Sequence, residues 1–218
     1  MDKILQLQDA TPLTRGRSRL VFRHPEDPDL IVKVVRPEVV DDRFGNNTKW
    51  YKKRRRFGKF ISYIREIQEF IAVHESEDKA PHYLQRIVGF CKTDMGLGLV
   101  VEAVLDDQGD LAPNLSTLIH TGRFDTLAED ALRTTLNNIL HSNVIVSDLN
   151  PGNLVYTHSQ DHGHYFVLID GLGNNNFIPS KILSSRLNQR SKLGRFDHLY
   201  KRIERNQLKY AQSQRHQE

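Results

Sequence analysis

The sequence is poor in cysteine and has no long apolar run. Among its 218 residues Cys91 is the single cysteine, so no internal disulfide can form and the chain fits a reducing compartment. The first eight residues lack the uninterrupted apolar core of a signal peptide, and no segment approaches the roughly 20 apolar residues that a membrane-spanning helix needs. These absences predict a cytoplasmic protein with no transmembrane segment.

Neither sign of charge dominates the chain, but its basic residues are concentrated in two blocks. The net charge is +4, from 31 basic and 27 acidic residues. One block covers residues 49–59, where Trp50, Tyr51 and Phe57 stand between the cations, and the other covers residues 181–215. Each block fits either a solvated helix face or a surface that binds nucleic acid, an anionic membrane or an acidic protein.

The first half of the chain predicts strands, one helix and then further strands. β-Branched runs at 20–22 and 30–35 flank a proline-bounded turn, which predicts a hairpin. Apolar residues then recur every three or four positions over 59–74, a pattern that is typical of an amphipathic helix. Two more strand-like runs follow at 86–91 and 97–105. This order is typical of a small β-rich unit.

A polar stretch at residues 106–110 predicts a boundary between two units. The first would be an N-terminal β-rich lobe with one helix, residues 1–105. The second would be a reduced helical C-terminal lobe, residues 106–218. Together they predict an α+β fold.

Helix signals bracket the second unit. Thr126, with Glu129 three positions later, is typical of a capping box, which predicts a helix that begins at Thr126 and stops near Ser142. A second helix is predicted over residues 181–210, with apolar residues on or near one stripe and a basic face that could meet a partner. Its cations belong to the second basic block.

A polar loop and the strand that follows it are the most informative part of the chain. Residues 147–155 read Ser-Asp-Leu-Asn-Pro-Gly-Asn-Leu-Val, and the apolar run that starts at Phe166 ends in Asp170-Gly171. An aspartate five positions before an asparagine, followed by Asp-Gly at a strand end, is how kinase-fold proteins supply a base and two metal-binding oxygens. Phosphoryl transfer is the first hypothesis, and an ordinary pair of turns is the alternative.

The order of these elements resembles the protein-kinase-like fold, and more narrowly the YrbL family of bacterial PhoP regulatory network proteins. The matching segments are Arg-Gly-Arg-Ser-Arg at 15–19, His-Pro-Glu-Asp at 24–27, Arg65-Glu66, and Asn-Pro-Gly-Asn-Leu at 150–154. The resemblance covers most of the chain. It implies a two-lobed protein-kinase-like fold with a reduced C-terminal lobe, and a link to a PhoP-controlled envelope stress response.

The resemblance also implies a nucleotide site in the first unit. Lys33, on its apolar strand, matches the lysine that holds the phosphates of ATP, and Gly16 matches a glycine of the phosphate-binding loop. A carboxylate on the predicted helix must orient such a lysine. Glu66 is the first candidate for that carboxylate and Glu69 is the second. Taken alone, Lys33 is better explained as a strand-end lysine in solvent.

The loop of the second unit would carry the chemistry. Asp148 would accept or orient the proton of the attacking hydroxyl group. Asn153 and Asp170 would coordinate the Mg²⁺ ions that bridge the phosphates, because hard cations prefer oxygen ligands. The resemblance therefore implies ATP and Mg²⁺ as cofactors, with an acceptor that the sequence does not identify.

The phosphate-binding segment departs from the kinase pattern. Residues 14–21 retain Gly16 but not the two other expected glycines, so the backbone is expected to approach phosphates less closely. The charges of Arg15, Arg17 and Arg19 could compensate. This departure weakens the step from fold to activity.

The catalytic loop and the tail also depart from the pattern. Val146 and Ser147 replace the usual His-Arg pair, and Asn150 replaces the lysine that is common in serine/threonine kinases. No Ala-Pro-Glu motif follows Asp170, which disfavours a protein-substrate kinase of ordinary design. Three hypotheses remain: a compact ATP-dependent phosphotransferase, a pseudokinase adaptor in a bacterial PhoP-linked network, and a basic module that binds an anionic partner.

Overall fold

The computed structural model confirms a mixed α+β fold. Its strands form one six-stranded sheet and one two-stranded sheet, and helices account for most of the remaining regular structure. The structure describes residues 3–39, 57–76, 81–173 and 184–215.

The chain divides into two compact units that interleave along the sequence. The first contains Met1–Ile67 and Arg86–Ala103, and the second contains Gln68–Gln85 and Val104–Glu218. Residues 68–85 thus belong to the second unit, although they lie well before residue 106 in the sequence.

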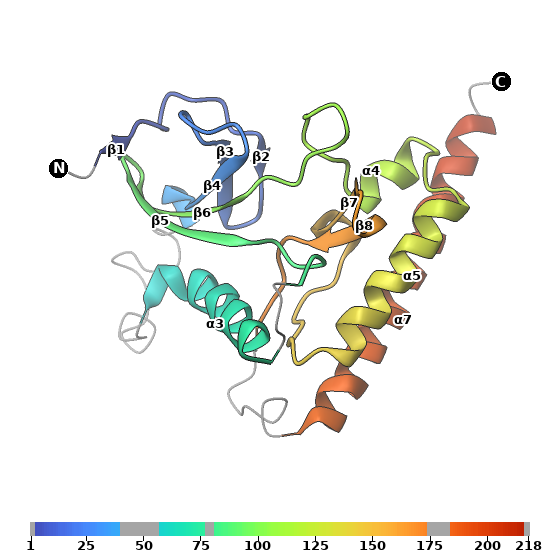
Figure 1. Cartoon of the computed structure of the whole chain (residues 1–218). Helices are drawn as coiled ribbons and strands as arrows, with labels where there is room; N and C mark the ends of the chain where they lie inside the picture. Colours follow the sequence, from blue (N-terminus) through green and yellow to red (C-terminus); the bar gives the residue numbers. More distant parts are fainter. Residues whose placement is uncertain (1–2, 40–56, 77–80, 174–183, 216–218) are drawn as a thin grey trace. The chain divides into compact units, whose positions relative to one another are not determined.

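The first unit is built on the six-stranded sheet, whose strand order is β1-β5-β6-β4-β3-β2 (Figure 1). β1 pairs with β5 in parallel, and the other neighbours are antiparallel. The predicted hairpin is confirmed as β3–β4, and the two later strand-like runs correspond to β5 and β6, which also pair antiparallel. The strands are β1 (Ile4–Leu5), β2 (Thr14–Arg15), β3 (Arg19–Arg23), β4 (Leu30–Val35), β5 (Ile87–Thr93) and β6 (Gly96–Glu102).

The central strand β4 is buried on both faces, which explains its unbroken β-branched run. Side chains alternate along a strand, so Val32 and Val34 pack into one cluster with Phe22. Ile31 and Val35 pack on the opposite face. Lys33 belongs to this second face because it lies between Ile31 and Val35 in the sequence. A lysine is thereby placed inside an apolar layer.

One helix packs on the Lys33 face of the sheet. It is α3 (Ile61–Ser76), preceded by a short 3₁₀ turn, η1 (Gly58–Phe60), and it confirms the helix predicted over 59–74. Tyr63 on α3 is fully buried in the cluster of β4 and β6, and its hydroxyl group donates to Lys33 O at 2.7 Å. Of the first basic block, residues 49–56 lie outside the described residues.

In the described residues of the second unit, the end of α3, further helices and a hairpin pack around one apolar core. The helices α5 and α7 lie side by side (Figure 1). The sequence did not predict the six-residue helix α4. The elements are α4 (Leu115–His120), α5 (Thr126–His141), a 3₁₀ turn η2 (Pro151–Asn153), β7 (Leu154–Ser159), β8 (Gly163–Leu168) and α7 (Ser185–Arg215).

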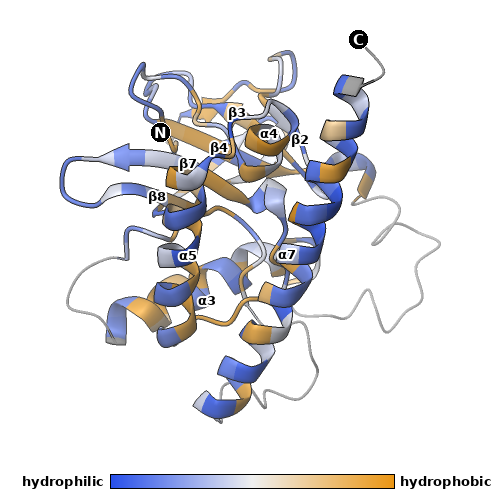
Figure 2. Cartoon of the chain, turned by 90° about the vertical axis from the view of Figure 1, so that its right-hand side faces the viewer, coloured by the Kyte–Doolittle hydropathy of each residue, from blue (hydrophilic) through white to orange (hydrophobic). Residues whose placement is uncertain are grey.

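Part of the apolar stripe predicted for α7 is exposed, and Figure 2 shows polar residues along most of the helix. Phe196, Leu199 and Ile203 are buried in the core, but Leu187 and Leu208 are exposed. The predicted start at residue 181 lies outside the described residues. Among the described residues, no helix is both long enough and apolar enough to span a membrane.

The predicted bounds of α5 are confirmed, but the predicted capping residue, Thr126, is wrong by one position. The N-cap is Asp125, which has an extended backbone, and its Oδ1 accepts a hydrogen bond from Ala128 N at 2.9 Å. Thr126 is the first residue inside the helix, so it does not cap it. The two positions are adjacent polar residues that favour N-caps, which is why the sequence signal selected the wrong one.

We expect Asp125→Ala to reduce the free energy of unfolding by about 1 kcal/mol, because the Ala128 amide would lose its acceptor. The matched control is Thr126→Ala, which should change stability by less than about half of that, since alanine is favoured inside a helix. Chemical denaturation monitored by circular dichroism measures both variants. An equal loss in the two variants would contradict the assignment of Asp125 as the cap.

Candidate functional site

Lys33 and Glu66 form a buried ion pair in the first unit. Lys33 Nζ lies 3.4 Å from Glu66 Oε2, and the two residues are 4% and 5% exposed. Strand β4 presents the lysine, and helix α3 presents the carboxylate. Because the pair is withdrawn from water, it holds the ammonium group in one place more firmly than a surface pair would. This is the contact that the resemblance implied, with Glu66 rather than Glu69 as the partner of Lys33.

Arg19 also binds Glu66, which the sequence analysis did not foresee. Its Nη1 lies 2.5 Å from Glu66 Oε1, and its side chain is buried. The two oxygens of one carboxylate thus meet two different cations. Arg19 therefore lies inside the unit and is not a solvent-facing substitute for a missing glycine. Arg15 pairs instead with the exposed Glu38 at 2.9 Å.

Gly16 lies in the tight turn that joins β2 to β3. Its amide donates to Arg19 O at 2.9 Å, and a methyl group at Gly16 would lie 3.3 Å from the same oxygen. The turn is therefore compact and favours a small residue. This places Gly16 in the segment where the resemblance predicted a phosphate-binding loop.

The second unit brings Asp148, Asn153 and the end of β8 together. Asn153 Nδ2 donates to Asp148 O at 3.3 Å, and Asn153 O accepts a hydrogen bond from Ile169 N at 2.9 Å. The asparagine therefore bridges the loop and the strand that ends at Asp170. The two residues of the loop and the strand end near Asp170 therefore lie close together within one unit.

A closer contact joins Gly171 to the same loop. Gly171 O accepts hydrogen bonds from Ser147 N at 2.7 Å and from Asp148 N at 3.0 Å. The backbone of Gly171 has a φ of +85°, and a methyl group placed on it would lie 1.9 Å from Asp148 O. Both facts require glycine at this position. Packing against the Asp148 loop therefore requires glycine at the second position of the Asp-Gly dipeptide.

The carboxylate of Asp148 faces solvent, where a substrate can reach it. Asp148 is exposed, and its Oδ2 accepts a hydrogen bond from Asn150 Nδ2 at 3.2 Å. Asn150 Oδ1 in turn accepts from Gly152 N at 3.0 Å, which fixes the amide of Asn150. Asn150 therefore orients the carboxylate, a role that the sequence analysis did not assign to it.

Asn153 and Asp170 have the donor types that suit a hard cation. The amide nitrogen of Asn153 is committed to Asp148 O, so the amide oxygen is the atom that can bind a metal. Asp170 Oδ1 accepts from Gly171 N at 2.6 Å, which limits rotation of this carboxylate. Within the part of the chain that the structure describes, no group of three or more His, Cys, Asp or Glu side chains could hold a metal ion. One carboxylate and one amide suit Mg²⁺ that takes its other ligands from phosphates and water.

A second buried network supports the segment before Asp148. Glu69, the alternative partner considered for Lys33, accepts a hydrogen bond from Ile145 N at 2.7 Å through its Oε2. Burial raises the pKa of Glu69, while this hydrogen bond and the charge of Lys192 oppose the rise. Lys192 on α7 is 1% exposed. Burial lowers the pKa of Lys192 to about 8, with the charge of Glu69 acting in the other direction.

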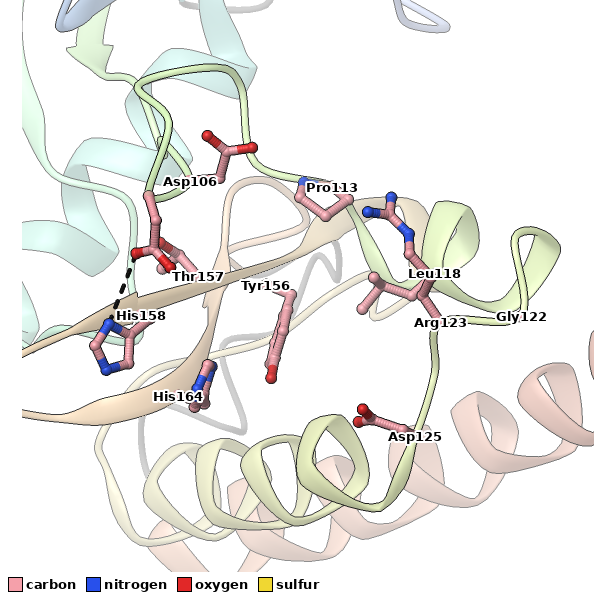
Figure 3. A pocket seen from close by; sticks show the side chains of 11 residues that line it. Asp106, Pro113, Leu118, Gly122, Arg123, Asp125, Tyr156, Thr157, His158 and His164 are labelled. Carbon is pink, nitrogen blue, oxygen red and sulfur yellow. Dashed lines mark ion pairs between the residues drawn. The ribbon is translucent and has the colours of Figure 1, made fainter.

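A separate pocket of about 390 Å³ lies on the second unit (Figure 3). Tyr156 projects between Asp125 and His164, and His158 pairs with Asp107 at a distance of 3.7 Å. None of the residues that the sequence predicted for a nucleotide or metal site lines it. The pocket is therefore distinct from the loop cluster around Asp148.

The protein is thus an α+β chain in which one unit holds a buried lysine–glutamate pair and the other holds an aspartate–asparagine loop locked to an Asp-Gly strand end. A model of the family described as PhoP regulatory network protein YrbL matches residues 5–204. The chain belongs to this family, as the sequence resemblance indicated.

Curated relatives and solved structures were also found. YrbL of Escherichia coli (strain K12) and YrbL of Shigella flexneri are each 24% identical over 180 residues, which cover 81% of this chain and 77% of the relative. A co-crystal structure of WbdD with the kinase inhibitor LY294002 has 14% identity and a TM-score of 0.42, over 71% of this chain. A high-resolution crystal structure of WbdD has 14% identity and a TM-score of 0.45, over 80%. The chain spans about a third of the WbdD chains, 31% and 35%.

The crowding around Gly171 predicts a large effect of a small substitution. We expect Gly171→Ala to cost about 3 kcal/mol of unfolding free energy or more, because the new methyl group would collide with Asp148 O in addition to straining the backbone. The matched control is Gly109→Ala: Gly109 has a φ of +80°, but nothing lies within 4 Å of the added methyl group. It should lose only about 1 kcal/mol. Denaturant titration compares the two, and equal losses would contradict the crowding.

The buried Lys192 predicts a pH dependence of stability. The unfolded chain keeps this proton up to a pH near 10.5, whereas the folded protein releases it near pH 8, so the unfolded state binds more protons between these values. The free energy of unfolding should therefore rise with pH in this window relative to Lys192→Met, by at most about 1.4 kcal/mol per pH unit. The same free energy of unfolding should decrease as the pH is lowered back toward 8.

Denaturant titrations between pH 7.5 and 9.5 measure this difference. The matched control is Lys201→Met, which removes an exposed lysine of the same helix. Its curve should run parallel to that of the wild type. Parallel curves for the wild type and Lys192→Met would contradict the assignment of a depressed pKa to Lys192.

Proposed function

We propose that this protein has a two-lobed protein-kinase-like fold with a reduced C-terminal lobe, and that it transfers phosphate from Mg²⁺-bound ATP to a hydroxyl group of a still unidentified acceptor. The observation that carries this proposal is the cluster of Asp148, Asn153 and the Asp170-Gly171 strand end. The buried pair of Lys33 and Glu66 supports it independently, from the other unit.

In this proposal the first unit binds nucleotide phosphates. Lys33 supplies the positive charge, and Glu66 restricts the lysine to one position through the 3.4 Å contact. At Gly16 the absence of a side chain leaves the main chain of the turn open to a phosphate. Such prepositioned charge lowers the cost of binding a polyanion, because the protein does not have to reorganise when the ligand arrives.

The second unit would carry out the transfer. The acceptor oxygen forms a bond to the γ-phosphorus while the bond from that phosphorus to the bridging oxygen breaks, and ADP leaves. Asp148 takes the proton that the acceptor hydroxyl loses, and Asn150 holds the carboxylate in place through its 3.2 Å hydrogen bond. Asn153 and Asp170 would hold Mg²⁺, which when bound neutralises charge on the phosphates.

The acceptor is proposed to be a small molecule, a sugar-bearing lipid or an unusual protein hydroxyl. An ordinary peptide substrate is disfavoured because the sequence lacks the Ala-Pro-Glu motif after Asp170. In line with the family, the protein would act in a bacterial PhoP-linked regulatory network as a cytoplasmic enzyme. Its partners would then be the nucleotide and this acceptor.

A pseudokinase adaptor is the second candidate, and the burial of Arg19 favours it. The segment at residues 14–21 has only one of the three glycines that the kinase pattern expects. Because Glu66 holds Arg19, one fewer arginine is available to compensate for the two missing glycines. Weaker contact with phosphates would then leave the fold as a platform for a protein partner. A basic module for an anionic partner is a third candidate, and its binding would weaken steeply with added salt.

We expect Mg²⁺-ATP to raise the melting temperature of the wild-type protein. At a ligand concentration about 100 times the Kd, the stabilisation is about 2.7 kcal/mol, or about 5 to 10 °C for a chain of this size. Asp170→Ala and Lys33→Met should lose most of this shift. Differential scanning fluorimetry with and without Mg²⁺ measures it. The absence of any shift in the wild type at saturating nucleotide would sink the phosphotransferase proposal.

Asp148→Asn separates the enzyme from the pseudokinase. The variant keeps the size of the side chain and should keep the thermal shift, because Asp148 is not among the proposed phosphate or metal ligands. ATP hydrolysis or transfer should fall by about 100-fold or more, since the base is lost. Equal turnover in Asp148→Asn and wild type would favour an adaptor that only binds nucleotide.

A further inference from the structure

One stripe of α7 carries polar side chains into the interior of the second unit. Asn188, Lys192 and Arg195 are spaced by four and three residues, so they follow each other on one face of the helix. Asn188 is 5% exposed and Lys192 is 1% exposed, while Arg195 is half-buried. The sequence analysis had assigned the two cations to a basic outer face. The structure corrects this for both of them.

Asn188 binds the chain just after α5. Its Nδ2 donates to Asn143 O at 3.3 Å and to Val144 O at 3.1 Å. These carbonyl groups belong to the irregular segment that follows α5. A buried carbonyl group without a partner is costly, so the contact fixes the path of the segment.

Lys192 binds the end of α5 itself. Its Nζ donates to Ile139 O and to Ser142 O, both at 2.7 Å. The last carbonyl groups of a helix lack partners within the helix and carry a partial negative charge. A cation at this position therefore satisfies two carbonyl groups at once and marks where α5 must end.

Arg195 reaches furthest along the loop. Its Nη1 donates to Ser147 O, the carbonyl group immediately before Asp148. Burial lowers the pKa of the Arg195 guanidinium group, and the negative charge of Asp148 opposes this. The arginine therefore both holds the peptide unit that precedes Asp148 and interacts with the charge of its carboxylate.

The amide groups of the same segment are held from other directions. Ile145 N donates to Glu69, and Ser147 N and Asp148 N donate to Gly171 O. With α7 binding the carbonyl groups, donors and acceptors of the loop are both fixed. The loop is thus held by long-range contacts on two sides.

We propose that Arg195 is a positioning residue, which α7 supplies to hold the backbone of the loop and thereby aim Asp148 at the acceptor hydroxyl group. Asn188 and Lys192 anchor the beginning of the same segment. The catalytic part of this inference rests on the proposed function, whereas the fixing of the loop does not. An arginine from a distant helix thus supports a loop whose own sequence has Ser147 where kinases carry arginine.

Hydrogen–deuterium exchange of the full-length protein tests the fixing of the loop. In Arg195→Gln the amides of residues 145–149 should exchange about tenfold faster than in the wild type, because the loop opens more readily once Ser147 O loses its charged donor. The matched control is Arg190→Gln, an exposed arginine of the same helix, which should leave these amides unchanged. Equal exchange in the two variants would overturn the proposal.

Steady-state kinetics test the aiming of Asp148. We expect Arg195→Gln to lower kcat by about tenfold while KM for Mg²⁺-ATP changes by less than about twofold, since nucleotide ligands are untouched. Arg195→Lys keeps a charge and a donor and should recover most of kcat. If Arg195 had a purely structural role, Arg195→Gln would instead lower the fraction of folded protein. It would not lower kcat at constant KM, and Arg195→Lys would not restore kcat.

The failures of the two proposals can be told apart. If the wild type shows no thermal shift with Mg²⁺-ATP, the proposed function fails, while the exchange experiment still decides whether α7 fixes the loop. If Arg195→Gln does not fold, Asn188→Ala replaces it. That variant should speed exchange at residues 143–147, and unchanged exchange there would overturn the role of α7.

Discussion

The contact between Gly171 and the backbone of Asp148 is the constraint on which the geometry of the second unit depends. Gly171 O binds two successive amide groups, and its own α-carbon lies against Asp148 O with no room for a side chain. The distance between the loop and the end of β8 is therefore set by main chain against main chain. Such a contact is more rigid than one that depends on the rotamer of a long side chain. It holds Asp148 and Asp170 near each other although they lie 22 positions apart in the sequence.

Buried charges in both units are best explained by positioning. Removing Lys33, Glu66, Glu69 or Lys192 from water has a desolvation cost that a single ion pair seldom recovers in full. Each of them nevertheless has defined partners: Glu66 meets two cations, and Lys192 meets two carbonyl groups. Apolar residues of similar volume would fill the same space without the cost. What they could not do is fix a carboxylate, an ammonium group or a carbonyl group in one orientation.

The sequence predicted the parts of the fold that depend on local periodicity. The β-branched runs at 20–22 and 30–35 and the three- and four-residue spacing over 59–74 correspond to β3, β4 and α3, because these segments pack against apolar neighbours. The contact between Lys33 and Glu66 was expected from the resemblance to the protein-kinase-like fold, with Glu69 as the alternative partner. The sequence did not predict the helix α4 because a segment of six residues is too short to show a helical period.

The supporting contacts of the loop could not be predicted in this way. Lys192 and Arg195 were expected on an exposed basic face, since charged side chains usually face water, and Glu69 was considered only as an alternative partner for Lys33. Whether they are buried depends on which carbonyl and amide groups the folded chain places opposite them. The adjacent residues Asp125 and Thr126 show the same limit at short range, because both types favour N-caps and the backbone conformation decides between them.

The helix α7 is the element that supports the carbonyl groups of the loop before Asp148. The irregular backbone of this loop leaves carbonyl groups that need partners. The helix α7 runs beside α5 and returns to this region late in the sequence, so its side chains can supply those partners. A helix that is polar enough to look solvated can fill this role, because its donors bind backbone while Phe196, Leu199 and Ile203 bind it to the core. The helix α7 contains both cations and apolar residues on one face because that face donates to the carbonyl groups of the loop and also packs into the core.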